Sequence, residues 1–167
     1  HLWTRLENIQ YNVRHAFITA EDKRFYSHWG FDHLAIARAA FQNVRHGKIV
    51  SGASTITLQV VRMLSPRPRT LNSKIIELFS AAKLERQLSK DEILEIYLNM
   101  LPMAGNVRGV PLAARTYFGK NVATLNTHEA IMLSIIPRAP ARFNPRKSAG
   151  RESLSKEAAR ICNSGFG

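Results

Sequence analysis

Two carboxylates stand side by side near the start of the chain, with aromatic residues and a histidine close behind them. The string EDKRFYSHWGFD at residues 21–32 opens with Glu21 and Asp22 and continues with Phe25 and His28. In such company the protonation of a carboxylate can be tuned for acid or base catalysis. A single glutamate is more often a solvated surface residue, and a turn histidine often binds only backbone, so the catalytic interpretation depends on the other motifs.

A second string, GASTITLQ at residues 52–59, is rich in hydroxyl groups at a predicted helix start. The backbone N–H groups of a helix start, with the side chains of Ser54, Thr57 and Gln59, suit an anion such as pyrophosphate. Arg62 follows three residues after Gln59, on the same helix face, and adds a positive charge. The alternative is an ordinary capping motif without a ligand.

The third motif pairs a cation with a carboxylate, because Lys74 precedes Glu77 by three residues. In the functional interpretation Lys74 binds phosphate and Glu77 lies beside it. The alternative is an i,i+3 surface ion pair, which contributes less than about 1 kcal/mol. The spacing alone does not decide between the two.

The composition predicts one domain with an anionic partner. The chain has 167 residues, with 24 Lys and Arg against 12 Asp and Glu, a net charge of +12 and a pI of about 10.6. Such a charge favours nucleic acid, anionic lipid or a phosphorylated substrate. The cations are spread among carboxylates without a recognition-helix pattern, which disfavours nucleic acid. The single cysteine, Cys162, excludes an internal disulfide.

Helical periodicity runs through nearly the whole chain, and no segment predicts a strand. The helix predicted over residues 8–22 carries Glu21 at its C-terminal end, where the negative end of the helix dipole favours a carboxylate that holds a proton. Capping motifs that begin at Ser89 and Asn126 predict the starts of two further helices. Further helices are predicted over residues 33–46, from Ser54 or Thr55 to 64, and over 73–87, 111–119 and 151–162.

Taken in order, the motifs resemble the peptidoglycan glycosyltransferase domain of family 51. They lie at residues 16–32, 52–59, 74–77, 88–99 and 113–120. The resemblance covers roughly residues 3–146, so we expect a glycosyltransferase domain over 1–146 and a C-terminal tail with a helix, as part of a truncated linker, over 147–167. The loop with Pro66 and Pro68 looks most like the 1C branch of class A penicillin-binding proteins. The family also includes monofunctional transglycosylases.

The resemblance implies an all-α, lysozyme-like helical domain with a deep substrate cleft. It implies polymerisation of lipid II into β-1,4 glycan strands, with inversion and release of undecaprenyl pyrophosphate. The expected partners are lipid II, the growing glycan strand and the membrane surface, at the extracytoplasmic (periplasmic) face of the bacterial cell membrane. Class A parents add a transpeptidase domain. No cofactor is obligatory, a divalent cation (Mg²⁺ or Mn²⁺) is optional, and no residue is assigned to a metal.

The family's site residues map onto this chain through the motifs. Glu21 matches the general base, and Glu77 matches the second carboxylate near the donor pyrophosphate. Arg62 and Lys74 match cations that offset the charge of the leaving group. The residues that match the cleft-forming positions are Asp22, Phe25, His28, Ser54, Thr57, Gln59 and Asn99.

One position departs from the family pattern, because Ser73 stands where many members have arginine. Arg67 or Arg69 in the preceding loop would supply the missing charge. In the family, the region around Leu34–Val50 contacts the membrane, and an ordinary core helix followed by a loop is the equal alternative.

Two other function classes remain open from the residues. A lysozyme-type or lytic enzyme that cleaves glycan also uses a helix-end glutamate, but its leaving group needs no Arg62 or Lys74. A basic helical domain that binds nucleic acid fits the net charge and little else.

Overall fold

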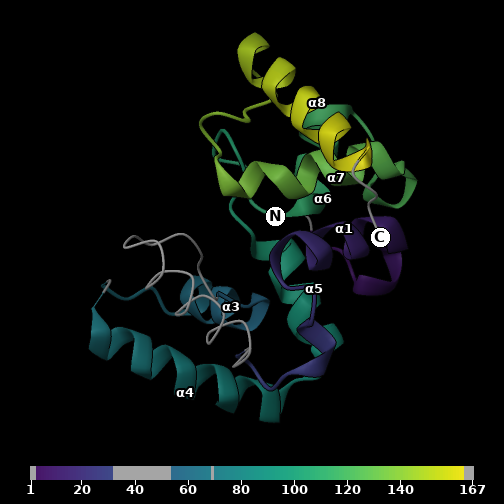
Figure 1. The fold of residues 1–167 in the computed structure, drawn as a ribbon. Coiled ribbons are helices and arrows are strands. Elements are labelled where there is room, and N and C mark those ends of the chain that lie inside the picture. Colours follow the sequence, from purple (N-terminus) through teal and green to yellow (C-terminus); the bar gives the residue numbers. More distant parts are fainter. Residues whose placement is uncertain (1–2, 32–53, 69, 164–167) are drawn as a thin grey trace. The chain divides into compact units, whose positions relative to one another are not determined.

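Helices account for the regular secondary structure of the computed structural model, which describes residues 3–31, 54–68 and 70–163. The predicted all-α class is confirmed (Figure 1). The helix predicted over 33–46 and the segment 34–50 lie outside the described residues. The α-helices are α1 (Tyr11–Glu21), α3 (Ile56–Leu64), α4 (Leu71–Gln87), α5 (Lys90–Met100), α6 (Val110–Phe118), α7 (Thr127–Ile135) and α8 (Ser148–Asn163), and the short 3-10 helices are η1 (Leu6–Asn8), η2 (Phe25–Ser27), η3 (Val122–Thr124) and η4 (Ile136–Arg138).

The chain divides into two units, and the first comprises His1–Ala20 and Glu95–Gly167. Within it α7 packs against α6 and α8, as Figure 1 shows. Phe17 of α1 and Tyr97 of α5 are fully buried, and their rings meet edge to face with centroids 6.3 Å apart. Because α8 packs on α7, the helix predicted in the C-terminal tail is part of this unit. The domain boundary at residue 146 stays a prediction.

The N-terminal segment is held to α5 by two side chains one helical turn apart. Glu95 accepts hydrogen bonds from the Trp3 indole at 2.9 Å and from the Leu6 backbone N–H at 2.8 Å. The Asn99 amide accepts from the Thr4 N–H and donates to the Thr4 carbonyl, each at 2.8 Å. These four bonds place an extended segment along α5 without a sheet.

A glycine is required where the chain turns into α6. Gly109 has φ 86°, and a Cβ built on it would lie 2.5 Å from the Asn99 carbonyl oxygen. The backbone of the turn therefore approaches α5 more closely than any side chain permits. Pro111 follows in the first turn of α6, where a missing N–H costs nothing.

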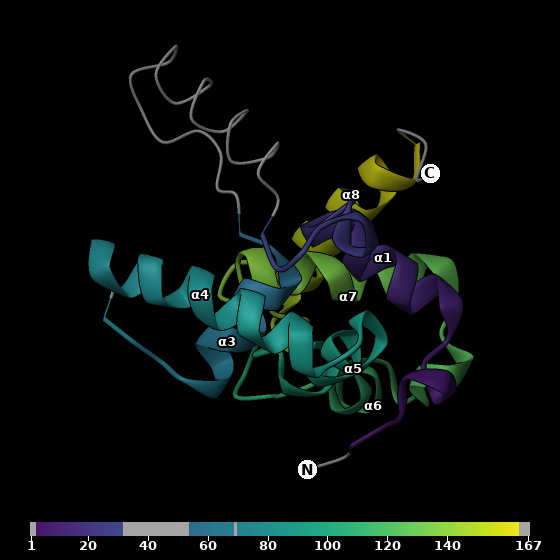
Figure 2. The ribbon, with the colours of Figure 1, turned by 90° about the horizontal axis from the view of Figure 1, so that it is seen from below.

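The second unit, Glu21–Leu94, contains the helix pair α3 and α4. The two helices lie against each other in both views (Figures 1 and 2). Apolar side chains fill the space between them, and the cluster consists of Leu58, Val61 and Ala81 with Phe31, Leu78 and Leu84 around it. In the part of the chain that the structure describes, no helix is both long enough and apolar enough to cross a membrane.

Local capping fixes most helix starts. The predicted capping boxes are present, with Ser89 and Glu92 bonded reciprocally before α5, and Asn126 and Glu129 before α7. Of the two caps considered for α3, Thr55 is the one observed, because its hydroxyl accepts from the Leu58 N–H.

The start of α4 was predicted two residues too late. The Thr70 hydroxyl accepts the Ser73 N–H at 3.1 Å, so α4 begins at Leu71 rather than at residue 73.

Removing the cap of α7 tests this account of its start. We expect Asn126→Ala to lower the free energy of unfolding by about 1 kcal/mol, because the Glu129 N–H then loses its acceptor. Urea unfolding with an unchanged m-value is the measurement. Asn126→Asp keeps an acceptor and serves as the control. Equal midpoints for Asn126→Ala and the wild type would contradict the assignment.

Candidate functional site

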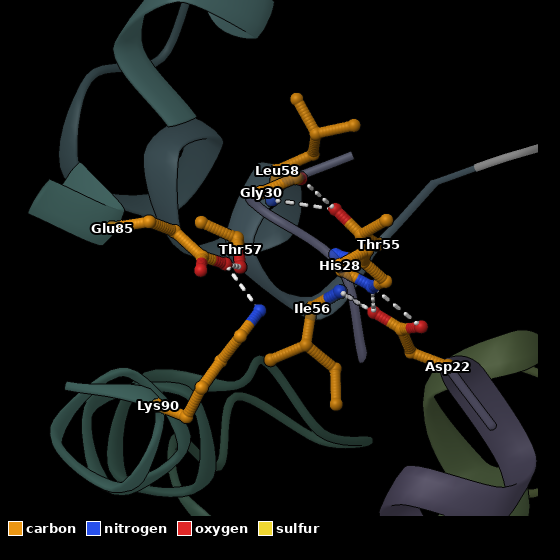
Figure 3. A network of polar contacts seen from close by, with 9 residues as sticks. All are labelled: Asp22, His28, Gly30, Thr55, Ile56, Thr57, Leu58, Glu85 and Lys90. Atoms are coloured by element: carbon orange, nitrogen blue, oxygen red, sulfur yellow. Dashed lines mark hydrogen bonds and ion pairs between the residues drawn. The ribbon is translucent and has the colours of Figure 1, made fainter. Parts of the chain in front are cut away.

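A buried carboxylate connects the turn after α1 with the start of α3 (Figure 3). Both oxygens of Asp22 lie 3.0 Å from His28 Nε2, and Oδ2 also accepts the Ile56 backbone N–H at 3.1 Å. The side chains of Asp22 and His28 are 4% and 3% exposed. Because a carboxylate only accepts, Nε2 carries the proton of this contact. Asp22 is thus satisfied by the protein itself.

The turn that follows η2 is joined to both helices of the unit. The Thr55 hydroxyl donates to the Gly30 carbonyl at 2.6 Å. Gly30 has φ 84°, and a Cβ there would lie 3.0 Å from the backbone of Ala81 on α4. Any other residue would push this turn away from α4 and strain the backbone.

The start of α3 is less open to an anion than its sequence predicts. The sequence predicts backbone N–H groups open to an anionic ligand, but the Ile56 N–H is bonded to Asp22 and the Leu58 N–H to Thr55. Thr57 is fully buried and donates to Glu85 at 2.5 Å. Two of the N–H groups at the start of α3 are therefore bonded to polar groups of the protein. The predicted contacts of Ser54 and Thr57 with substrate stay predictions.

Two side chains on one face of α3 bind the two predicted catalytic carboxylates. The Gln59 amide donates to Glu21 Oε2 at 3.0 Å, and the Arg62 Nε donates to Glu77 Oε2 at 2.8 Å. Gln59 and Arg62 are one helical turn apart, as their spacing predicts. The partner of Glu77 is Arg62, so the surface ion pair between Lys74 and Glu77 is not formed.

Beyond Arg62 the second unit has a cavity of about 530 Å³ with a positive lining. This volume lies in the range of small-molecule sites. Among the described lining residues, the cations are Arg62, Arg67 and Lys74 and the carboxylate is that of Glu77. The lining residues are Arg62, Pro66, Arg67, Pro68, Thr70, Ser73, Lys74 and Glu77. The arrangement suits an anion larger than a single carboxylate.

The departure at Ser73 has a structural explanation. Ser73 is buried in the first turn of α4, and its hydroxyl lies 2.9 Å from that of the cap Thr70. A small side chain therefore completes the helix start at this position. Arg67 lines the same cavity as Lys74, so a cation from the loop is present there. Arg69 lies outside the described residues.

Two further predicted residues are packed inside the protein. Phe25 is fully buried, and its ring meets His28 edge to face with centroids 6.4 Å apart. Asn99 is 2% exposed and belongs to the other unit, where it is bonded to Thr4. A role of either residue in substrate binding stays a prediction.

Sequence reasoning missed Glu85 and Lys90, which lie behind α3 and bind each other at 2.6 Å. No motif marked Glu85, and Lys90 lies in the predicted capping box and in the motif at residues 88–99 but received no role. Among the described residues, no cluster of three histidine, cysteine, aspartate or glutamate side chains is placed to bind a metal ion.

The ion pair of Arg62 and Glu77 is expected to contribute to stability. The Glu77 side chain is 9% exposed and that of Arg62 is 44% exposed, so Arg62→Met leaves a largely buried carboxylate without its cation. We expect a loss of about 1–2 kcal/mol, between the values for surface and buried pairs. Urea unfolding is the measurement, with Arg160→Met in the exposed pair of α8 as the matched control. Equal losses in the two variants would contradict the assignment.

Comparison with known proteins supports the resemblance found in the sequence. A family model described as Transglycosylase matches residues 1–164. The chain is 41% identical over 151 residues to penicillin-binding protein 1C of Escherichia coli (strain K12), covering 90% of the chain and 20% of that protein. It is 44% identical over 144 residues to penicillin-binding protein 1A of Aquifex aeolicus (strain VF5), covering 86% and 20%. For penicillin-binding protein 1A of Neisseria gonorrhoeae the identity is 42% over 156 residues, covering 93% and 20%. The chain thus spans about a fifth of the length of these relatives.

Proposed function

The chain belongs to the transglycosylase family, and on this premise we propose that it is a peptidoglycan glycosyltransferase that polymerises lipid II. One observation carries the proposal beyond family membership. A single face of α3 binds Glu21 through Gln59 and Glu77 through Arg62, beside a cavity lined by cations. A carboxylate base and a cationic leaving-group site are what transfer from a sugar diphosphate requires.

Glu21 is the general base of the proposed reaction. It removes the proton of the acceptor sugar's 4-hydroxyl while that oxygen attacks C1 of the donor. The new β-1,4 bond forms as the bond between C1 and the diphosphate oxygen breaks, so the configuration at C1 inverts. The electron pair leaves with undecaprenyl pyrophosphate, and the proton on Glu21 returns to solvent. The Gln59 amide, 3.0 Å from Oε2, orients the carboxylate for this transfer.

The cavity residues bind the diphosphate. Arg62, Arg67 and Lys74 offset the charge that grows on the leaving oxygens. Glu77 keeps Arg62 in place through their 2.8 Å bond. A hydrolase that cleaves glycan releases an uncharged sugar, for which three cations have no use. The cavity therefore favours synthesis over cleavage.

A divalent cation is an optional component of this proposal. Mg²⁺ at such sites is bound by one or two carboxylates together with substrate phosphates. Glu77 is the carboxylate in the described lining, and it is already bonded to Arg62. Glu77 and the substrate would hold the ion, which would add positive charge at the leaving group.

The outward face of α4 supports a membrane surface as partner. Leu71, Ile75 and Phe79 are 78%, 53% and 74% exposed, whereas Ser73 and Glu77 face inward. The helix thus turns apolar residues to the outside. Both of its carboxylates, Glu77 and Glu85, are buried, while its exposed charged residues are Lys74, Lys83 and Arg86. An apolar face with basic residues and no exposed carboxylate fits an anionic lipid surface.

Replacing the base tests the proposed chemistry. We expect Glu21→Gln to lower the rate of polymer formation from lipid II in detergent by about 10²–10⁴-fold, because the acceptor hydroxyl then keeps its proton. Glu152→Gln, at an exposed site on α8, is the matched control and keeps the wild-type rate. Full activity of folded Glu21→Gln would overturn the role of Glu21. An inactive wild type would overturn the proposed function.

Polar replacements on α4 test the membrane contact. The triple variant Leu71→Gln, Ile75→Gln, Phe79→Gln is expected to lose most of its co-sedimentation with vesicles that contain anionic lipid, because the apolar face no longer favours the interface. Its unfolding midpoint should stay close to that of the wild type, since these side chains are exposed. Leu154→Gln, at a buried position on α8, would instead lower the midpoint. Unchanged vesicle binding by the triple variant would contradict the contact.

A further inference from the structure

We infer that Glu85 and Lys90 are positioning residues for the proposed reaction and act through Thr57; this rests on the proposed function. One oxygen of Glu85, Oε1, accepts two short hydrogen bonds, from the Thr57 hydroxyl at 2.5 Å and from the Lys90 ammonium at 2.6 Å (Figure 3). The three side chains come from α3, α4 and α5, all within the second unit. Thr57, Glu85 and Lys90 thus form one continuous set of hydrogen bonds, called here the connection.

The connection is largely buried. The side chains of Glu85 and Lys90 are 4% and 19% exposed, and Thr57 is fully buried. A charge in such surroundings is tolerated only when it is paired and hydrogen-bonded. The pair on α8 formed by Glu152 and Lys156 has side chains 68% and 75% exposed and shows what an ordinary surface pair looks like. Because Glu85 is buried, its carboxylate must keep its hydrogen bonds to Thr57 and Lys90.

Two polar contacts hold α3 at its two ends. Thr57, the second residue of α3, binds Glu85 in the last turn of α4, and Arg62 near the end of α3 binds Glu77 in the first half of α4. The helices therefore run antiparallel, with one contact at each end of α3. Apolar packing between them does not set a direction, whereas two separated hydrogen bonds fix the rotation of α3 about its axis.

The rotation of α3 decides where Gln59 points. Gln59 follows Thr57 by two residues, and its amide reaches Glu21 at 3.0 Å. Without the Thr57 bond, a small rotation of α3 lengthens this contact and misaligns the carboxylate. Displacements of about 1 Å at a catalytic group lower rates strongly.

Lys90 also contacts the turn after Glu21. Its Nζ lies 4.5 Å from the centroid of the Phe25 ring, a cation–π distance. Lys90 thus lies between Phe25 on η2 and Glu85 on α4, and it stabilises the turn as well as α3. Neither Lys90 nor Glu85 lines the cationic cavity. Their effect is therefore expected on turnover rather than on diphosphate binding.

Kinetics of variants that keep side-chain shape test the inference. Thr57→Val removes the hydroxyl, and the double variant Glu85→Gln, Lys90→Met removes both charges together, which avoids an unpaired buried ion. For each we expect kcat for lipid II polymerisation to fall about tenfold, with KM within about twofold of the wild type. Thr57→Ser keeps the hydroxyl and should recover about fivefold in kcat over Thr57→Val. The triple combination should lose no more than either variant, since all interrupt one connection.

The double variant Glu152→Gln, Lys156→Met on α8 is the matched control and keeps wild-type kinetics. If Thr57→Val changes only the unfolding midpoint and leaves kcat unchanged, the positioning role is overturned. A rise in KM alone would overturn it too, because it would indicate lost binding. If the wild type does not polymerise lipid II, the proposed function fails, and the connection is judged by hydrogen exchange at the amides of residues 56–59. Faster exchange in Thr57→Val would support the connection, and unchanged exchange would overturn it.

Discussion

The site depends on the hydrogen bonds that the buried carboxylate of Asp22 accepts. This carboxylate receives hydrogen bonds from His28 and from the Ile56 backbone, so the turn after α1 and the first residue of α3 meet at one group. A buried carboxylate is stable only while these donors are present. A displacement of either donor from Asp22 is therefore costly. Glu21 is the neighbour of Asp22 in sequence. The contacts that hold Asp22 therefore also restrict the position of Glu21.

From that point α3 carries the functional geometry. Leu58 and Val61 pack against α4, while Gln59 and Arg62 on another face reach Glu21 and Glu77. The same helix thus joins the apolar core of its unit to both carboxylates. At its own start the Ile56 and Leu58 N–H groups are bonded within the protein, so in the proposal the positive charge for a diphosphate comes from side chains around the cavity. Arg62, Arg67 and Lys74 provide that charge, and they are three of the 24 lysines and arginines of the chain.

Local features of the fold were predictable from the sequence. The capping boxes at Ser89 and Asn126 were found because a cap and its partner lie three residues apart, and the shared face of Gln59 and Arg62 follows from helical spacing. The late start predicted for α4 is a missed local signal, since Thr70 caps Ser73 at the same spacing.

Contacts between distant segments were not predictable. The spacing left an ion pair of Lys74 with Glu77 open as one of two alternatives, whereas packing of α3 on α4 brings Arg62 to Glu77. The bonds from Thr57 to Glu85 and from Asn99 to Thr4 join residues 28 and 95 positions apart, and no period in the sequence encodes them. Resemblance to a family supplied the catalytic roles, and the structure supplied the polar contacts that hold those residues.

The central claim is transfer from a lipid diphosphate, and it is tested most directly by product stoichiometry. Purified wild-type chain is incubated with lipid II in detergent, and released undecaprenyl pyrophosphate and new β-1,4 linkages are quantified from the same samples. The account predicts one diphosphate for each linkage throughout the time course. Release of diphosphate without new linkages, or cleavage of purified sacculi with no diphosphate released from lipid II, would contradict it.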